Sequence, residues 1–264
     1  IITATGKTRW IGQTVKTIFD EADKQKISGF YAIARNITKN KKQELQLIRA
    51  HQSIVEKNIT ITSSLRYARM IQRSHLTNSD MLKRFFKDFV LYYQPRDIVS
   101  GDFYWFGETM DRFVVVVGDC TGHGIPGGFL TMIALNQLNT IVHEKRIADP
   151  SRILAHLDSA MYDGLSYRYR NDETLDGMEV AVCSFDKNEN IVYFSGAKRP
   201  LFHYSNSERK IIKPTSKPIG EVHPSRLMNY AVEPIRFETG DSFYMFSDGV
   251  TDQFGGKKSK KFSF

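Results

Sequence analysis

The sequence predicts an α+β domain that follows a long helix and a β-hairpin. From Phe85 onward, short runs rich in β-branched and aromatic residues are separated by turn residues, as in a protein of many short strands. Two longer segments with helical periodicity lie among these runs, and residues 39–78 contain neither Pro nor Gly. Strands in number with a central pair of helices favour sheets that are covered by helices.

The first elements predict a hairpin. Strand-like runs at Ile11–Phe19 and Ile27–Ile37 flank the polar turn Asp20–Lys26. Because an isolated hairpin is only marginally stable in water, we expect the chain to begin inside a domain whose earlier part is missing.

The segment 39–78 predicts one long helix. Apolar or small residues recur at nearly heptad spacing, which is typical of a helix that pairs with a copy of itself. These residues are Leu45, Ile48, Val55, Ile59, Leu65 and Ala68. The alternative is a single helix that packs on one of its neighbours.

The third region predicts strands and two helices. The strands are expected at Phe85–Tyr93, Arg112–Asp119, Glu179–Phe185, Ile191–Ser195, Leu201–Tyr204, Leu227–Phe237 and Ser242–Phe246. The helices are expected at Pro126–Glu144 and Pro150–Arg168, and in the second of these the apolar residues from Leu154 to Leu165 share one face.

Charge and composition exclude several classes of function. The first 80 residues hold 14 basic and 6 acidic residues and so carry the whole net charge of +8, whereas the remainder is balanced. The larger part therefore lacks the basic surface of a nucleic-acid-binding protein. No apolar run is long enough to span a membrane, and both cysteines, Cys120 and Cys183, lie in strand-like segments. A protein of a reducing compartment, hence a cytoplasmic one, is expected.

Three acidic residues stand beside glycines, each where an apolar strand is expected to stop. Asp102 lies in Ser-Gly-Asp-Phe-Tyr, Asp119 in Gly-Asp-Cys-Thr-Gly-His-Gly, and Asp248 in Ser-Asp-Gly-Val-Thr-Asp. Each alone is typical of a turn. Converging carboxylates, however, repel one another by roughly 4 kcal/mol per pair at 4 Å and an effective dielectric of 20, and so require a cation or a shared proton. Oxygen donors without a Cys/His cluster favour Mg²⁺ or Mn²⁺.

These three motifs, in this order, resemble the metal-dependent PPM-type serine/threonine phosphatases in their SpoIIE-like (RsbU-like) branch. Weaker echoes are Ser195-Gly196-Ala197 before Pro200, and Lys217-Pro218-Ile219-Gly220. The resemblance implies an αββα sandwich of two antiparallel sheets flanked by helices, with two Mn²⁺ or Mg²⁺ ions at the sheet ends. A metal-bound water would attack a phosphoserine or phosphothreonine without a phosphoenzyme intermediate.

The resemblance also implies roles for individual residues. Asp102 and Asp119 would bind metal, with Asp119 bridging both ions, and the Cys120 carbonyl would be a backbone ligand. Asp248 would bind the second side of the metal pair.

Four further residues are candidates around that centre. Arg96 is a candidate phosphate clamp, since a guanidinium matches phosphate geometry, although a solvated arginine is the alternative. His123 is a candidate proton donor to the leaving serine oxygen, and the alternative is a residue of the helix entry. Glu179 and Asp176 are candidate outer-shell or substrate-side acids.

The resemblance implies a further metal-binding Asp some tens of residues after Ser-Asp-Gly, and the sequence reaches Phe264 without it. A fragment that is weakly active or inactive is therefore expected. At the other end, Trp10, Ile27-Ser28-Gly29-Phe30 and Ala34–Thr38 resemble the closing strands of a PAS sensor domain, in which Asp is commoner at the position of Asn36. The resulting division is a PAS-like part (1–38), a linker helix (39–80) and a phosphatase domain (81–264).

The leading hypothesis is a cytoplasmic protein phosphatase of bacterial signalling, a homodimer through its linker helix. Its substrate would be a phosphorylated regulator of the anti-sigma-factor-antagonist type. The alternatives are a pseudophosphatase that acts as a signalling adaptor, and a metal-dependent hydrolase of small phosphoesters or nucleotides. The last lacks a phosphate-binding Gly-x-x-x-x-Gly-Lys-Ser/Thr loop.

Overall fold

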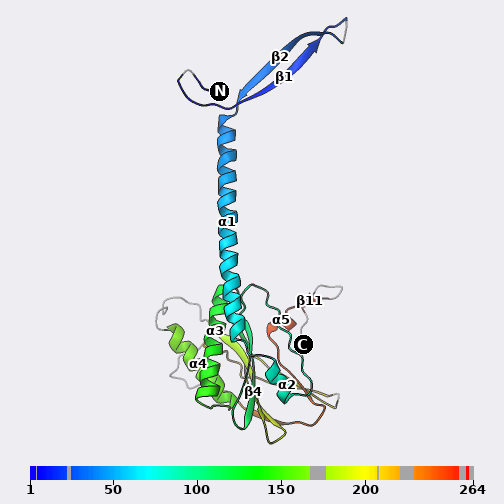
Figure 1. Cartoon of the computed structure of the whole chain (residues 1–264). Helices are drawn as coiled ribbons and strands as arrows, with labels where there is room; N and C mark the ends of the chain where they lie inside the picture. The colour runs from blue at the N-terminus through cyan, green and yellow to red at the C-terminus, as the bar shows by residue number, and fades with distance from the viewer. Residues whose placement is uncertain are drawn as a thin grey trace. The chain divides into compact units, whose positions relative to one another are not determined.

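The computed structural model (Figure 1) describes residues 1–3, 5–22, 25–166, 177–206, 208–220, 229–255 and 260–261. The chain divides into two units, Ile1–Ser64 and Leu65–Phe264. The long helix α1 (Thr38–His75) belongs partly to each. Within the described residues, no helix has the length and apolar character that crossing a membrane requires.

The first unit contains the expected hairpin and the start of the expected helix. Strands β1 (Ile11–Phe19) and β2 (Ile27–Asn36) pair antiparallel. The Asn36 side chain accepts a hydrogen bond from the Thr38 backbone N–H at 3.1 Å, so it supports the first turn of α1 as capping residues do. Apolar side chains such as Phe30 and Ile33 are exposed, as expected of two strands without a packed third layer.

The second unit is a mixed α+β fold with antiparallel sheets, which confirms the predicted fold class. Its strands form a five-stranded sheet (order β3-β4-β5-β6-β9), a three-stranded sheet (β10-β7-β8) and a two-stranded sheet (β11-β12). The elements in chain order are α2 (Asp80–Phe85), β3 (Asp102–Glu108), β4 (Arg112–Cys120), α3 (Ile125–Asn139), the π-helical turn η1 (Thr140–Glu144), α4 (Pro150–Ser166), β5 (Met178–Asp186), β6 (Ile191–Ala197), β7 (Leu201–Ser205), β8 (Glu208–Ile212), β9 (Glu233–Arg236), β10 (Ser242–Tyr244), α5 (Asp248–Thr251), β11 (Phe254–Gly255) and β12 (Lys260–Lys261).

Strand β4 separates two hydrophobic cores because successive side chains of a strand point to opposite faces. Val114 and Val116 belong to the core on the helix side of the sheet. Phe113 and Val115 belong to the core on its other side, together with Leu201 of β7. The five-stranded sheet therefore lies between a helical layer and the three-stranded sheet.

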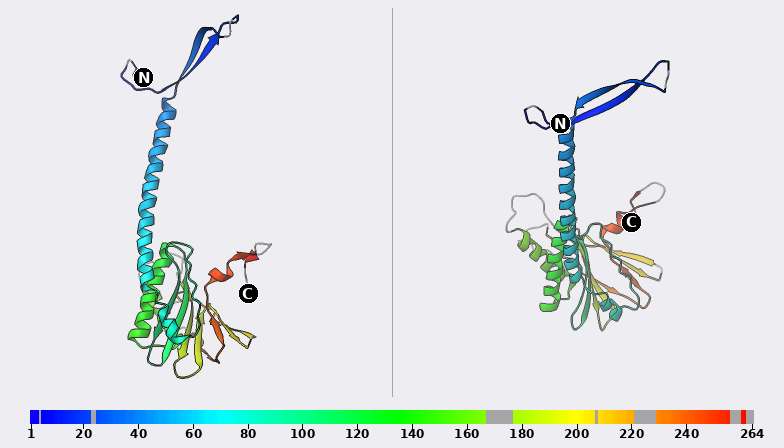
Figure 2. Two further views of the ribbon diagram at one scale, coloured as in Figure 1. Left: turned by 45° about the vertical axis from the view of Figure 1, so that its right-hand side comes forward. Right: turned by 45° about the horizontal axis from the view of Figure 1, so that its top comes forward.

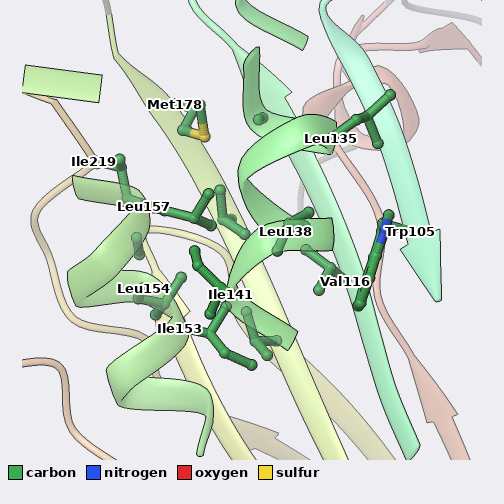
Figure 3. Close-up of a cluster of buried hydrophobic side chains, with 14 of the residues drawn as sticks. Trp105, Val116, Leu135, Leu138, Ile141, Ile153, Leu154, Leu157, Met178 and Ile219 are labelled. Atoms are coloured by element: carbon green, nitrogen blue, oxygen red, sulfur yellow. The ribbon is translucent and has the colours of Figure 1, made fainter. Parts of the chain in front are cut away.

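Helices α3 and α4 form that helical layer (Figures 1 and 2). Leu135, Leu138, Leu154 and Leu157 point from the helices toward the sheet, in a core that also contains Trp105 (Figure 3). All five side chains are 1% exposed or less. Burial of an aliphatic side chain of this size contributes roughly 1.5–3 kcal/mol, so this layer holds the sheet and its ends in place.

The strand predicted at Phe85–Tyr93 is wrong. Phe85 ends α2, and residues 86–101 form no strand. The alternation that suggested a strand is real, because Phe89, Leu91 and Tyr93 are partly buried while the residues between them are exposed. The side chains follow a strand-like pattern, but the backbone has no ladder of hydrogen bonds to a neighbouring strand.

Other boundaries differ in smaller ways. Strand β9 begins at Glu233 rather than Leu227, and residues 227–228 lie outside the described part of the chain. Strand β10 ends at Tyr244 instead of Phe246. Strand β8 was not predicted because four of its five residues are exposed and it carries no apolar alternation.

Candidate active site

Three carboxylates form a row across the central strands of the five-stranded sheet. Asp102 of β3 lies opposite Asp119 of β4, and Asp119 lies opposite Glu179 of β5. Residues directly opposite in antiparallel strands project from the same face. The three side chains are therefore neighbours on one face, although Asp102 begins its strand rather than ending it.

A guanidinium lies among the carboxylates. The Arg199 NH2 group donates a hydrogen bond to Asp119 Oδ2 at 2.9 Å and forms an ion pair with Asp248 Oδ2 at 3.4 Å. Its Nε lies 2.9 Å from Glu179 Oε2. The Arg199 side chain is only 12% exposed. One buried cation thus connects acids from β4, β5 and the first turn of α5.

Arg199 lies in the turn between β6 and β7, and the backbone of this turn sets its position. Lys198 has a φ of +59°, in the left-handed region that non-glycine residues seldom adopt. Its backbone N–H is held by the Thr215 carbonyl at 2.8 Å. A Cβ atom on Gly196 would lie 2.3 Å from the Arg199 carbonyl oxygen, so the turn requires glycine there. Backbone strain of this kind is often found at functional sites.

The electrostatics of the acids show that they are crowded. Burial, with added repulsion from Asp102 and Asp248, raises the pKa of Asp119 to about 7. Burial also raises the pKa of Asp102. Asp102 Oδ1 is buried and has no hydrogen-bond partner within the described part of the chain. A buried carboxylate oxygen without a partner beside two more carboxylates suits a divalent cation with oxygen ligands.

The acidic side chains lie too far apart, in the described part of the chain, to coordinate one ion together. Among the described residues, no three His, Cys, Asp or Glu side chains lie close enough together to hold an ion. The guanidinium of Arg199 lies where the acids converge and satisfies part of their charge. Chemically the donor set fits Mg²⁺ or Mn²⁺, and its present counter-ion is Arg199.

Cys120 has a buried thiol and a backbone carbonyl that lies close to Gly101. Its Sγ is buried against the Thr131 hydroxyl at 3.7 Å, and burial raises the pKa of the thiol to about 12, so it stays protonated. The Cys120 carbonyl oxygen lies next to Gly101, where a Cβ atom would come within 2.9 Å of it. Only glycine lets the chain before Asp102 approach this carbonyl so closely.

Gln72 and Thr131 fix the loop that leads into Asp102. The buried side-chain amide of Gln72 donates to the Ser100 carbonyl at 2.7 Å and accepts from the Ser100 N–H at 3.0 Å. The Thr131 hydroxyl of α3 contacts the carbonyls of Ser100 and Gly101 at 3.0 and 2.9 Å. The last turns of α1 and the helix α3 therefore both support the acidic row.

His123 and Arg96 lie on the same cavity as the acids. This cavity has a volume of about 1780 Å³, and its lining includes Arg96, His123, Asp102, Asp119, Arg199 and Asp248. His123 is exposed, with Nδ1 3.0 Å from Asp97 Oδ2. Arg96 is also exposed. Glu179 belongs to the acidic row, and Asp176 lies outside the described residues.

Sequence reasoning missed Arg199 and Asp97. Arg199 lies in the stretch from Ser195 to Pro200, which attracted notice only as a weak echo of a family motif. Its proximity to Asp119, 80 positions earlier, is a consequence of the sheet order and cannot be read from local spacing. Asp97 stands next to the candidate Arg96, but only the fold shows that it contacts His123.

Comparison with known proteins gives a consistent result. Residues 109–263 match the family model of stage II sporulation protein E (SpoIIE). The solved structure of the SiaA-PP2C domain of Pseudomonas aeruginosa is 31% identical, with a TM-score of 0.68, and the match covers 79% of this chain and 80% of that one. The RsbU and RsbW domains of Rv1364c from Mycobacterium tuberculosis share the fold at 18% identity and a TM-score of 0.50, over 62% of this chain and 43% of that one. A search of the curated proteins finds no match.

Proposed function

The chain belongs to the SpoIIE family of PP2C-type phosphatases, and on that premise we propose that it is a metal-dependent protein serine/threonine phosphatase of bacterial signalling. The observation that carries the proposal is the row of Asp102, Asp119 and Glu179 across three strands, with Asp248 at the same cation. Partly buried carboxylates that lie this close together repel one another unless a cation lies among them.

PP2C-type phosphatases are metal-dependent. In this chain Asp102, Asp119, Asp248 and the Cys120 carbonyl would hold two Mn²⁺ or Mg²⁺ ions, with Asp119 shared between them. Such ions supply an activated water and neutralise charge on a phosphoryl group.

The remaining residues would act on the phosphoserine or phosphothreonine itself. Asp97 accepts from Nδ1 of His123 and so orients the imidazole, leaving Nε2 to donate a proton to the departing hydroxyl oxygen. Arg96 lines the same cavity, and its guanidinium would bind the phosphate oxygens. Glu179 would remain at the edge of the metal pair as the partner of Arg199.

Release of phosphate from a phosphoserine peptide tests the proposal. We expect turnover with Mn²⁺ or Mg²⁺, none with EDTA, and none in Asp119→Asn. The assay is run on this chain and on a version extended into any sequence that follows Phe264 in its gene. Turnover that survives both EDTA and Asp119→Asn would overturn the proposal, and faster release from ATP than from the peptide would indicate a small-molecule hydrolase instead.

The position of Arg199 supports a second candidate function, a pseudophosphatase that serves as an adaptor. A guanidinium that satisfies the acids permanently would leave no place for metal. Calorimetry distinguishes the two functions, since an adaptor would bind no Mn²⁺ in the millimolar range through Asp102 and Asp119.

Two partners are proposed, a phosphoprotein substrate on the basis of the family and a second copy of the chain on the basis of α1. The substrate would be a phosphorylated regulatory protein of the anti-sigma-factor-antagonist type, in the cytoplasm. Apolar residues of α1, among them Ile48 and Ile59, are exposed in the described structure, and we propose that they pair with those of a second copy. The hairpin β1–β2 would be the end of a PAS-like sensor, from which α1 carries a signal to the phosphatase.

A further inference from the structure

The position of Arg199 leads to an inference about how metal enters the site, and it rests on the proposed function. We propose that Arg199 is a built-in counter-ion of the acidic row, which divalent cations must displace from Asp119 and Asp248. The site would therefore exist in two forms, one closed by the guanidinium and one closed by metal.

The contacts of Arg199 divide into two groups. Its NH2 nitrogen contacts Asp119 and Asp248, two carboxylates proposed to bind metal. Its Nε faces Glu179, which is proposed to lie outside the metal pair. Displacement therefore needs only the far end of the guanidinium to move, while Glu179 keeps the near end in the cavity.

Electrostatic repulsion favours replacement of the Arg199 guanidinium by metal over binding of both at the same carboxylates. A guanidinium and a divalent cation that share the same carboxylate oxygens would repel each other strongly across a distance of a few ångströms, in surroundings that screen little. Arg199 is only 12% exposed, so water does little to weaken this repulsion. Conversely, without Arg199 and without metal, the only basic group paired with the row of acids among the described residues would be Lys198, whose Nζ is 3.9 Å from Glu179.

The opposite effect, that Arg199 gathers the acids and so helps metal to bind, is the smaller one. Asp102, Asp119 and Glu179 are already held side by side by the ladders of β3, β4 and β5. Asp248, on the short helix α5, lies outside these ladders and contacts Arg199, but the neighbouring Ser247 also hydrogen-bonds to Asp102. Removal of Arg199 should therefore strengthen metal binding.

Calorimetric titration with Mn²⁺ tests this directly. We expect Arg199→Gln and Arg199→Ala to bind Mn²⁺ at least tenfold more tightly than the unaltered chain. The Mn²⁺ affinity of Arg199→Lys should lie between that of the unaltered chain and that of these neutral variants, because lysine keeps the charge but cannot contact two carboxylates as a planar guanidinium does. Thermal unfolding in EDTA should show the reverse order, with the neutral variants the least stable. Arg209→Ala is the control, since it removes an exposed arginine of β8 in the other sheet.

A measurement on the unaltered chain covers the case in which the variants fail to fold. The NMR signal of the Arg199 guanidinium NH2 group, assigned through bonds from the Arg199 backbone of the unaltered chain, should shift on saturation with Mg²⁺. If the chain binds Mn²⁺ but the Arg199 variants bind it no more tightly, or if this signal does not shift, the exchange is excluded. If neither the chain nor any Arg199 variant binds Mn²⁺, the proposed phosphatase function fails as well.

Discussion

Asp102 and Asp119 lie directly opposite each other on neighbouring antiparallel strands, where two like charges destabilise a sheet. The fold keeps this unfavourable pair and partly buries it, and the buried Oδ1 atom of Asp102 has no hydrogen-bond partner among the described residues. Strand pairing thus places electrostatic repulsion at the position where we propose that metal binds. Repulsion between the two carboxylates lowers the stability of the folded chain, and a bound cation would remove this repulsion.

Repulsion in this pair predicts an unusual dependence of stability on pH. In the metal-free chain the pKa of Asp119 is raised to about 7 by burial and by Asp102, whereas an unfolded Asp titrates near 3.9. The folded state therefore holds the proton more strongly. The resulting stabilisation is complete below about pH 4 and is lost as the pH rises through 7.

Urea unfolding in EDTA between pH 4.5 and 8 measures this effect. The free energy of unfolding should fall by roughly 3 kcal/mol over that range relative to Asp119→Asn, given about 1.4 kcal/mol per pKa unit. Asp163→Asn, an exposed change on α4, should keep the dependence of the unaltered chain. Identical pH dependence in the chain and in Asp119→Asn would show that Asp119 is not the group responsible.

Gln72 predicts a coupling between α1 and the acidic row. In Gln72→Ala the buried Ser100 N–H loses its partner, which should lower the free energy of unfolding by about 1–3 kcal/mol. Because Ser100 lies two residues before Asp102, Mn²⁺ affinity should fall as well. Gln46→Ala makes the same chemical change at an exposed position of the same helix and should alter neither quantity. Normal Mn²⁺ binding in Gln72→Ala would mean that the loop holds its shape without α1.

Gly101 predicts a strict requirement for a small residue next to the Cys120 carbonyl. In Gly101→Ala the new Cβ would lie 2.9 Å from that oxygen and 3.0 Å from the Gly122 carbonyl oxygen, so the backbone must shift. We expect a loss of about 1–3 kcal/mol of stability, as for overpacking, and weaker Mn²⁺ binding. Gly29→Ala is the matched control, since its Cβ would meet nothing within 4 Å. Equal thermal midpoints for the two variants would contradict the prediction.

The sequence was sufficient for the parts of the fold that depend on local pattern. The run at Arg112–Asp119 predicted β4, the absence of Pro and Gly predicted α1, and the apolar face from Leu154 to Leu165 predicted α4. The strand predicted at Phe85–Tyr93 was wrong because alternating apolar residues indicate which side chains face a core. They do not indicate whether the backbone has a neighbouring strand to pair with. Strand β8 was missed for the opposite reason, since it pairs well but is exposed.

The candidate site was predictable only in part, because it combines local and distant relationships. Asp102, Asp119 and Asp248 were each marked by neighbouring glycines, so the sequence identified them individually. The arrangement of Glu179 opposite Asp119, and of Arg199 between them, depends on the order β3-β4-β5-β6, which is set by packing between distant segments. No spacing rule along the chain relates residues that are 80 positions apart.

The apolar surface of α1 gives the last prediction, which concerns self-association. The residues Leu45, Ile48, Val55 and Ile59 recur at heptad spacing on one side of the helix, while Leu47, Ile54 and Ile61 form a second line with an exact seven-residue repeat. Both lines are exposed. If the first line is the seam of a parallel dimer, a lysine there must be buried at the interface, whereas a lysine on the second line stays in water.

Sedimentation velocity separates these cases. We expect a dimer for the unaltered chain, a monomer or a dimer at least tenfold weaker for Ile59→Lys, and an unchanged dimer for Ile54→Lys, because a buried unpaired charge is costly and an exposed one is not. Circular dichroism should show that both variants keep the helix, since lysine is a good helix former. A dimer that is broken by Ile54→Lys and kept by Ile59→Lys would place the seam on the second line, and a monomer in all three would show that α1 does not mediate self-association.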